Sequence, residues 1–271
     1  MQLDHSQPLR PATRRLTVGL ARDATDVRAA QRLRWKVFVE EQGARIETPE
    51  EGYDIDDLDD HCQHLIVTEA GRDGVIGTYR LLTAEAARRA GGYYAEREFE
   101  MGGLLGQRRR LLEIGRSCVL PGYRTGSTIA LLWAGLAEFL IDSGHDALIG
   151  CASIPLRADR VASSQLASAL CRTHPAPDVL SVAPKRALPV ITGAACEPTP
   201  IPPLLKGYLR SGALVCGEPC WDPEFDCADL FLYLGLDQLA SRYARRFLPN
   251  GVSDDSIVRP GSVRIPSVHV A

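Results

Sequence analysis

One segment of the sequence constrains the fold more than any other, because strand, loop, helix and strand patterns follow one another in it without a break. Residues 111–120 (LLEIGRSCVL) have the pattern of a strand and lead through Pro-Gly-Tyr-Arg into an apolar helix pattern at 127–143. A second strand pattern follows at 147–153, and a helix pattern lies near 159–172. This order predicts a sheet with helices packed against it.

Other segments predict that most of this sheet is antiparallel. Residues 64–70 and 75–83 are strand-like and are joined by a glycine-bounded turn at 71–74, which is typical of a hairpin. Further strands are predicted at 15–22, 213–217 and 228–236, and a helix at 25–42 with Thr25 as its N-cap. The expected fold class is therefore α/β (α+β), with a mixed, mostly antiparallel central sheet flanked by helices.

The same patterns predict one domain between two tails. Residues 1–14 are expected to be a mobile tail, 15–248 a single domain ending in a basic helix at 238–248, and 249–271 a disordered tail. Eight of the 18 prolines fall in 175–203, which disfavours regular structure there. This segment is interpreted as an excursion from the sheet, with no further explanation than its proline content.

Composition excludes several classes of protein. The net charge is −3, so no basic field indicates a nucleic-acid partner. The longest apolar run, 131–141, is too short to span a bilayer, and the N-terminal residues lack the apolar core of a secretory signal, so a cytoplasmic location is expected. The eight cysteines lie mostly in apolar runs without a C-x-x-C pair, which predicts buried free thiols and no structural metal.

Motifs of several common chemistries are absent. The sequence contains neither G-x-x-x-x-G-K-[ST] nor G-x-G-x-x-G, and the GRSCV at 115–119 lacks the second glycine of a serine-hydrolase nucleophile elbow. A His-x4-Asp acyltransferase motif is also missing.

Four segments together resemble a known family: RLRWKVFVEEQG (32–43), DIDDLDDHCQHLIV (54–67), GTYRLL (77–82) and LEIGRSCVLPGYR (112–124). They are similar to the ornithine N-alpha-acyltransferases, which are distantly related to acyl-homoserine-lactone synthases and share the GNAT acetyltransferase fold. PPLLKGYLRSGALVCGEP (202–219), with Phe225 and Ala228-Asp229, extends the resemblance over about residues 28–236.

The resemblance implies an N-acyltransferase that moves a 3-hydroxyacyl group from acyl carrier protein to the alpha-amino group of L-ornithine. It implies direct attack of the amine on the thioester, with acyl carrier protein as co-substrate and no other cofactor. Two alternatives remain: a lactone synthase that uses S-adenosylmethionine, and a non-catalytic module that binds an acyl carrier or a lipid. Lysine and glutamine also remain open as acceptors, and coenzyme A as the donor.

Matching residues carry the implied catalytic roles. Glu113 is the candidate general base or ammonium-positioning group, with Arg116 beside it; the alternative is a structural Glu113 paired with Arg80 or Arg116. Residues three apart on a regular strand face opposite ways, so a bulge is expected at Gly115 if both line one site.

The substrate-binding match comprises Arg34, Phe38, Asp57, Asp60 and Arg80, although a purely structural salt-bridge network explains the arginines equally well. Residues 40–60 carry ten acidic side chains and one basic one, Arg45. This loop is interpreted either as an electronegative rim that attracts ornithine or as a solvated surface.

Two groups of residues are expected to bind the donor. The loop after Leu120 resembles a pyrophosphate loop that lacks its full glycine spacing, which favours a single phosphopantetheine phosphate over coenzyme A. The apolar helix at 129–141 is read either as an acyl-tunnel wall or as core, and the basic helix at 238–248 suggests peripheral contact with the inner membrane. The candidate phosphopantetheine and carrier residues are Arg124, Gly126 and Ser127, with Arg88, Arg89, Arg108, Arg109 and Arg110.

Overall fold

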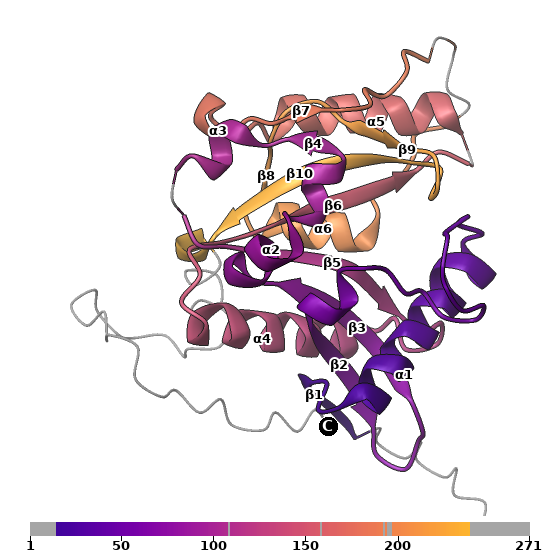
Figure 1. Ribbon diagram of the computed structural model, residues 1–271. Helices are drawn as coiled ribbons and strands as arrows, with labels where there is room; N and C mark the ends of the chain where they lie inside the picture. The colour runs from indigo at the N-terminus through magenta and orange to yellow at the C-terminus, as the bar shows by residue number, and fades with distance from the viewer. Residues whose placement is uncertain (1–14, 108, 158, 192, 194–196, 239–271) are drawn as a thin grey trace, which may run out of the picture.

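The computed structural model describes residues 15–107, 109–157, 159–191, 193 and 197–238. An eight-stranded sheet runs through it in the order β1-β2-β3-β5-β6-β10-β8, with β9 also paired to β10 (Figure 1). Among the strands of this sheet that the structure describes, β5 and β6 are the only parallel pair, so the expected mixed, mostly antiparallel sheet is confirmed. The strands are β1 (Leu16–Leu20), β2 (Gln63–Glu69), β3 (Val75–Leu82), β5 (Leu111–Val119), β6 (Ala147–Pro155), β8 (Leu214–Val215), β9 (Cys220–Asp222) and β10 (Cys227–Gly235).

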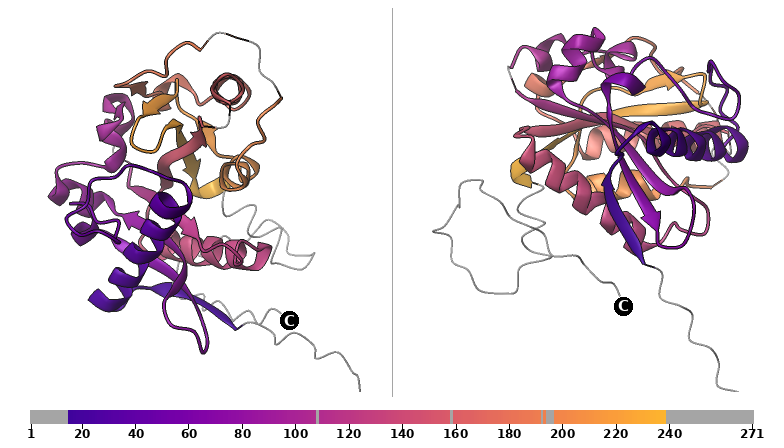
Figure 2. Two further views of the ribbon diagram at one scale, coloured as in Figure 1. Left: turned by 90° about the vertical axis from the view of Figure 1, so that its right-hand side faces the viewer. Right: turned by 60° about the horizontal axis from the view of Figure 1, so that its bottom comes forward.

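Helices cover both faces of this sheet. In the left view of Figure 2, α1, α2 and α3 lie on one side of the strands and α4, α5 and α6 on the other. Short turns of other helix types, η1 to η4, and a small second sheet of β4 and β7 complete the described elements. Their bounds are α1 (Ala24–Trp35), η1 (Lys36–Glu41), η2 (Asp59–His61), α2 (Ala84–Ala90), η3 (Tyr94–Arg97), β4 (Phe99–Glu100), α3 (Gly102–Leu105), α4 (Gly126–Asp142), α5 (Arg160–Thr173), η4 (Asp178–Leu180), β7 (Ala183–Pro184) and α6 (Pro203–Arg210).

Strand alternation assigns each side chain of β3 to one of these two faces. A Cβ atom at position 77 would touch Leu132 of α4, so Gly77, and with it Tyr79, faces α4. Arg80 points to the opposite face, where it meets Asp59 below α1. The α4 face is apolar near the centre of the sheet, whereas the α1 face carries buried charges.

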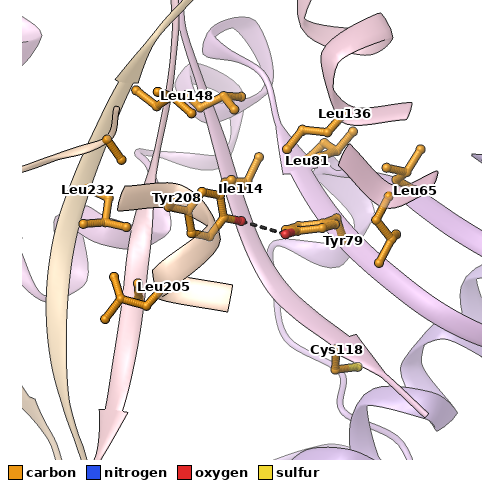
Figure 3. Packing of buried hydrophobic residues seen from close by; sticks show 14 of the residues in the cluster. Leu65, Tyr79, Leu81, Ile114, Cys118, Leu136, Leu148, Leu205, Tyr208 and Leu232 are labelled. Atoms are coloured by element: carbon orange, nitrogen blue, oxygen red, sulfur yellow. Dashed lines mark hydrogen bonds between the residues drawn. The ribbon is translucent and has the colours of Figure 1, made fainter. Parts of the chain in front are cut away.

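The two parallel strands diverge after a short paired stretch. β5 and β6 pair only from Leu111–Ala147 to Glu113–Ile149, and toward their carboxyl ends they separate. The hydroxyl of Tyr208 on α6 donates a 2.8 Å hydrogen bond to that of Tyr79 on β3 across this gap (Figure 3). A cleft therefore opens in the middle of the sheet, with backbone groups along both of its edges that do not pair with each other.

Several local predictions need correction. The N-cap of α1 is Asp23, whose carboxylate accepts the N–H groups of Thr25 and Asp26, because the helix begins at Ala24 and not after Thr25. The proline-rich segment keeps some regular structure, since β7 pairs with β4 and Ala187 bridges to Cys220. The predicted tails and most of the helix at 238–248 lie outside the described residues.

We predict that Gly150→Ala destabilises the protein. A Cβ atom at position 150 would lie 2.3 Å from the carbonyl oxygen of Ile114, and a backbone atom cannot move aside as a flexible side chain can. Overpacking of this kind typically costs about 1–3 kcal/mol. Urea unfolding measures the loss, with Gly103→Ala as the control, because nothing lies within 4 Å of a Cβ at position 103. Equal stability of the two variants would contradict the close approach of β5 and β6.

Candidate active site

The cleft between β5 and β6 is the mouth of a cavity of about 450 Å³ that passes through the sheet. Its lining differs between the two faces, as strand alternation requires. On the α4 face the wall is apolar, and α6 contributes Leu204, Leu205 and Tyr208 to it. On the α1 face the wall is polar and includes Arg80, Tyr94, Glu98, Glu113, Arg116, Asp222 and Asp229.

The apolar wall comes from α6 and not from the helix that sequence reasoning singled out. α4 packs on β1, β2 and β3, so residues 129–141 belong to the core and do not form the wall of an acyl tunnel. Its Trp133 supports α6 from behind, with its ring 4.9 Å from that of Tyr208. Leu148, Leu205 and Leu232 extend the apolar surface along β6, α6 and β10 (Figure 3).

Glu113 is buried, with 4% of its surface exposed, at the point where β5 and β6 separate. Its two carboxylate oxygens accept the backbone N–H groups of Tyr94 and Ala95, both at 2.7 Å, at the start of η3. It therefore forms no ion pair with Arg80 or Arg116, contrary to the structural alternative for this residue. Burial raises the pKa of Glu113 to about 7 in spite of these hydrogen bonds, which lower it.

The expected bulge in β5 is present, one residue later than anticipated. Thr78 pairs with Cys118 and Arg80 with Gly115, so β5 contains one residue more than β3 between these pairs. Arg116, and not Gly115, has the left-handed conformation, with a φ of 49°. The bulge brings Glu113 and Arg116 into the lining of the same cavity.

Ion pairs hold the strained Arg116 in place. Its Nε lies 3.3 Å from Asp54 and its Nη2 3.4 Å from Asp56. The guanidinium carbon also lies 5.0 Å from the centre of the Tyr94 ring and 5.3 Å from that of Phe225. Non-glycine residues in this region of φ are costly, and such positions are frequent at functional sites.

A buried network of three arginines and three aspartates joins α1, β3 and β5 to the loop before β2. Arg34, which is 0% exposed, contacts Asp59 at 2.6 Å and Asp54 at 3.1 Å. Arg80 contacts Asp56 at 2.6 Å and Asp59 at 3.2 Å. Although burial acts in the opposite direction, the hydrogen bonds and charges of the arginines hold the pKa of Asp56 and of Asp59 below its usual range.

Two of the acids chosen from the sequence lie outside this network. Asp57 is exposed and pairs with Arg97 at 2.8 Å, and Asp60 is exposed beside the buried Asp59. Their places are taken by Asp56 and Asp59, one residue earlier in each case. A run of aspartates does not reveal by itself which members face inward, because the chain turns into η2 at Asp59.

Of the other predicted binding residues, Phe38 and Arg80 line the cavity, whereas Arg34 lies beneath its wall. The Phe38 ring packs edge-on against Phe225 at 5.7 Å. Six of the ten acids of the acidic loop pair with arginines: Asp54, Asp56 and Asp59 in the network, Glu41 with Arg124, Glu50 with Arg28, and Asp57 with Arg97.

Sequence reasoning did not select a second group of acids, Glu98, Asp222 and Asp229, which line the cavity on the α1 face. Burial, and after it the nearby Asp229 carboxylate, raises the pKa of Glu98, and burial also raises that of Asp229. Asp229 was detectable as the one charged residue in the apolar run of β10. Glu98 carried no such signal, because it lies among other charged residues.

The predicted donor-binding residues divide into two places. Gly126 and Ser127 lie in the first turn of α4, beyond the carboxyl end of β5. Arg124 beside them forms a bidentate ion pair with Glu41, with both N···O distances at 2.6 Å. Arg109 and Arg110 precede β5 at its other end, about 25 Å away for a strand of this length.

The arginines at this other end are therefore far from the opening of the cleft. Arg109 donates to the Tyr233 hydroxyl at 2.9 Å, and Arg110 to the carbonyl of Gly144. Arg88 and Arg89 are exposed on α2. The residues predicted for the phosphate and those predicted for the carrier thus lie in separate places, and Arg108 lies outside the described residues.

Three further observations concern metal ions, disulfides and membranes. Donor atoms of Asp222, Cys227 and Asp229 lie within 4.8 Å of one another, and no other described group of three His, Cys, Asp or Glu residues is so arranged. None of the seven described cysteines is in a disulfide. In the part of the chain that the structure describes, no helix is both long and apolar enough to cross a membrane.

Comparisons with known proteins agree with this architecture. The family model of the acetyltransferase (GNAT) domain matches residues 33–134. Two solved structures share the fold: FeeM, an N-acyl amino acid synthase from uncultured soil microbes (TM-score 0.51, 13% identity, 87% of this chain and 98% of that chain), and the acyl-homoserine lactone synthase BjaI (TM-score 0.52, 17% identity, 94% and 96%).

Relatives in sequence are closer. The L-ornithine N(alpha)-acyltransferase of Rhizobium meliloti is 38% identical over 84% of this chain and 82% of its own length. That of Rhodobacter capsulatus is 32% identical over 83% of this chain and 92% of its own length.

The fold, the divergent strands and the cavity between them define an N-acyltransferase of the GNAT class. Within that class, the chain belongs to the L-ornithine N(alpha)-acyltransferase family, which confirms the resemblance found in the sequence.

We predict that Asp59→Ala lowers the free energy of unfolding by about 3–5 kcal/mol at neutral pH, because it leaves Arg34 and Arg80 buried without their shared partner. Asp60→Ala is the matched control and is expected to change stability by less than about 0.5 kcal/mol. Since the pKa of Asp59 is lowered in the folded state, the stabilisation is complete above the ordinary aspartate pKa of about 4 and decreases as the pH falls below it. Equal losses in the two variants, measured by urea unfolding, would refute the assignment of Asp59 to the network.

Proposed function

We propose that the protein transfers a 3-hydroxyacyl group from acyl carrier protein to the alpha-amino group of L-ornithine, giving lyso-ornithine lipid. The observation that carries this proposal is the cavity at the β5–β6 cleft, which has an apolar wall on one face of the sheet and an acidic wall on the other. A fatty acyl chain suits the first wall, and a cationic amino acid suits the second. The names of the relatives supply ornithine as the acceptor.

The geometry supports direct transfer. The thioester lies in the cleft, where the facing backbone groups of β5 and β6 are not paired with each other and are available to the amides of the phosphopantetheine arm. The neutral alpha-amine attacks the thioester carbonyl carbon, the tetrahedral oxyanion collapses, the C–S bond breaks and the thiolate leaves. Glu113 takes the proton from the amine, and a carboxylate with a pKa near 7 suits this role at neutral pH.

The cleft opens at the carboxyl ends of β5 and β6, and the first turn of α4 lies beyond the end of β5. The N–H groups of Gly126 and Ser127 are therefore the proposed partners of one phosphopantetheine phosphate. Arg116 is assigned to the acceptor side, because its guanidinium lines the cavity beside Tyr94.

In this proposal acyl carrier protein is the co-substrate and no further cofactor is needed. The enzyme is cytoplasmic and makes peripheral contact with the inner membrane, because its product is a lipid. A non-catalytic carrier-binding module is the second candidate function, since a cavity of this shape also accommodates an acyl group without turnover.

Mass spectrometry of the reaction products tests the proposal. Purified full-length protein is given 3-hydroxyacyl carrier protein and L-ornithine, with the coenzyme A thioester as donor and lysine or glutamine as acceptor in parallel reactions. We expect N-acyl-ornithine that depends on the carrier. Product from another amino acid would contradict the assignment of ornithine as the acceptor. An equal yield from the coenzyme A thioester would contradict the assignment of acyl carrier protein as the donor. No product at all would favour the binding module.

Glu113→Gln tests the proposed base. We expect kcat/KM to fall about 100-fold or more and the ascending limb of the pH profile near pH 7 to disappear, because an amide cannot take the proton. Glu96→Gln is the matched control, since Glu96 accepts the N–H of Tyr93 in the same turn but does not line the cavity. If both variants lose activity equally, Glu113 acts only by fixing η3, and the assignment of the base is wrong.

A further inference from the structure

The α1 face contains two groups of buried carboxylates that differ in how their charge is balanced. Asp54, Asp56 and Asp59 are matched by three arginines, so this network needs no further cation. The cavity acids, which we define as Glu98, Asp222 and Asp229, have no such partners: among the described residues, no lysine or arginine forms an ion pair with any of them.

Two of the cavity acids, Asp222 and Asp229, are buried close together, and Glu98 is partly buried. Asp222 is 8% exposed and Asp229 3% exposed, and their carboxylates lie within 4.8 Å of each other and of the Cys227 thiol. Some hydrogen bonds are present: Asp222 accepts the N–H groups of Glu224 and Phe225, and Asp229 accepts from Cys227 at 3.5 Å. One oxygen of Glu98, Oε2, is buried without any hydrogen-bond donor.

Neighbouring buried carboxylates cannot all ionise unless a positive charge joins them, because burial and mutual repulsion both disfavour the charged form. The raised pKa values of Glu98 and Asp229 express this imbalance. A cation that enters the cavity would remove it. Unlike the inward-facing aspartates of the loop before β2, the cavity acids therefore form a site that a positively charged ligand completes.

The position of the cavity acids fits one end of a diamino acid. Glu113 on β5 and Asp229 on β10 face the same side of the sheet, with β6 between the two strands. Strands two places apart are about 10 Å from each other, and Asp229 lies four residues, or about 13 Å, along β10 from Tyr233, which is level with Glu113 through Ile149. The same cavity is lined by Glu113 and by the cavity acids, so an amino acid bound in the cleft can direct its methylene chain along the cavity toward the cavity acids.

We propose that Glu98, Asp222 and Asp229 bind the side-chain ammonium of L-ornithine and so select a diamino acid over a neutral one. This inference rests on the proposed function, because it takes ornithine as the acceptor. The carboxylates act in recognition, whereas the proton of the alpha-amine goes to Glu113.

Steady-state kinetics with Glu98→Gln and Asp229→Asn in the full-length protein test this inference. We expect KM for L-ornithine to rise about 10-fold to 100-fold while kcat stays within about twofold of the wild type. L-norvaline, which is ornithine without the terminal amino group, serves as a competitive inhibitor, and we expect its inhibition constant not to change. Glu100→Gln is the matched control, because Glu100 is exposed, two residues further along, and does not line the cavity.

Three results would overturn the inference. The first is an unchanged KM for ornithine in both variants. The second is an equal weakening of ornithine and norvaline, or a fall in kcat in place of a rise in KM, which would assign the carboxylates to the fold or to the chemical step. The third is one equivalent of a divalent metal ion in the wild-type protein that Asp229→Asn loses, since the metal would then be the missing cation.

The activity of the wild-type enzyme distinguishes a failure of this inference from a failure of the proposed function. If the wild type does not acylate ornithine, the proposed function fails. If it does so and the variants keep the wild-type KM, only the assignment of the cavity acids is wrong.

Discussion

The active site depends on the early end of the pairing between β5 and β6. Parallel neighbours in a sheet normally remain paired along their length, but here only three residue pairs form before the strands separate. The bulge at Arg116 turns the backbone of β5, and the hydrogen bond from Tyr208 to Tyr79 joins the two sides of the gap. The resulting cleft passes through the sheet, and strand alternation gives it one apolar and one polar wall.

The buried charged residues on the polar face of the sheet form two different arrangements. Where arginine and aspartate numbers match, as around Arg34 and Asp59, the charges are held in place and the loop before β2 is fixed against the sheet. Such a network tolerates loss of a partner poorly, because the remaining charge stays buried. Where the acids outnumber the bases, as at Glu98 and Asp229, the protein leaves room for a cationic ligand. Carboxylates whose charge is balanced by arginines thus stabilise the fold, whereas carboxylates without basic partners are available to bind a ligand.

Sequence reasoning was most reliable for elements with a strong pattern. The β2–β3 hairpin, β5, α4 and β6 lie within a few residues of their predicted bounds, because alternation and helical periodicity are local properties. Sequence reasoning failed to identify which of several neighbouring polar side chains faces inward. Asp56 and Asp59 occupy the network in place of Asp57 and Asp60, and Asp23 caps α1 in place of Thr25, because the folded path of the backbone decides which polar side chain of a run faces inward or caps a helix.

The sequence by itself determined the family, the mixed sheet and the candidacy of Glu113 and Arg116, because these are carried by motifs whose order and spacing are visible along the chain. Only the tertiary structure decided which acids surround the cavity. Asp222 ends β9 and Asp229 lies on β10, and these two meet through the pairing of their strands, whereas Glu98 precedes β4, far away in the sequence, and joins them at the cavity only in the folded chain. The electrostatic character of the site arises from their combined burial, and burial is a property of the folded chain that no single segment carries.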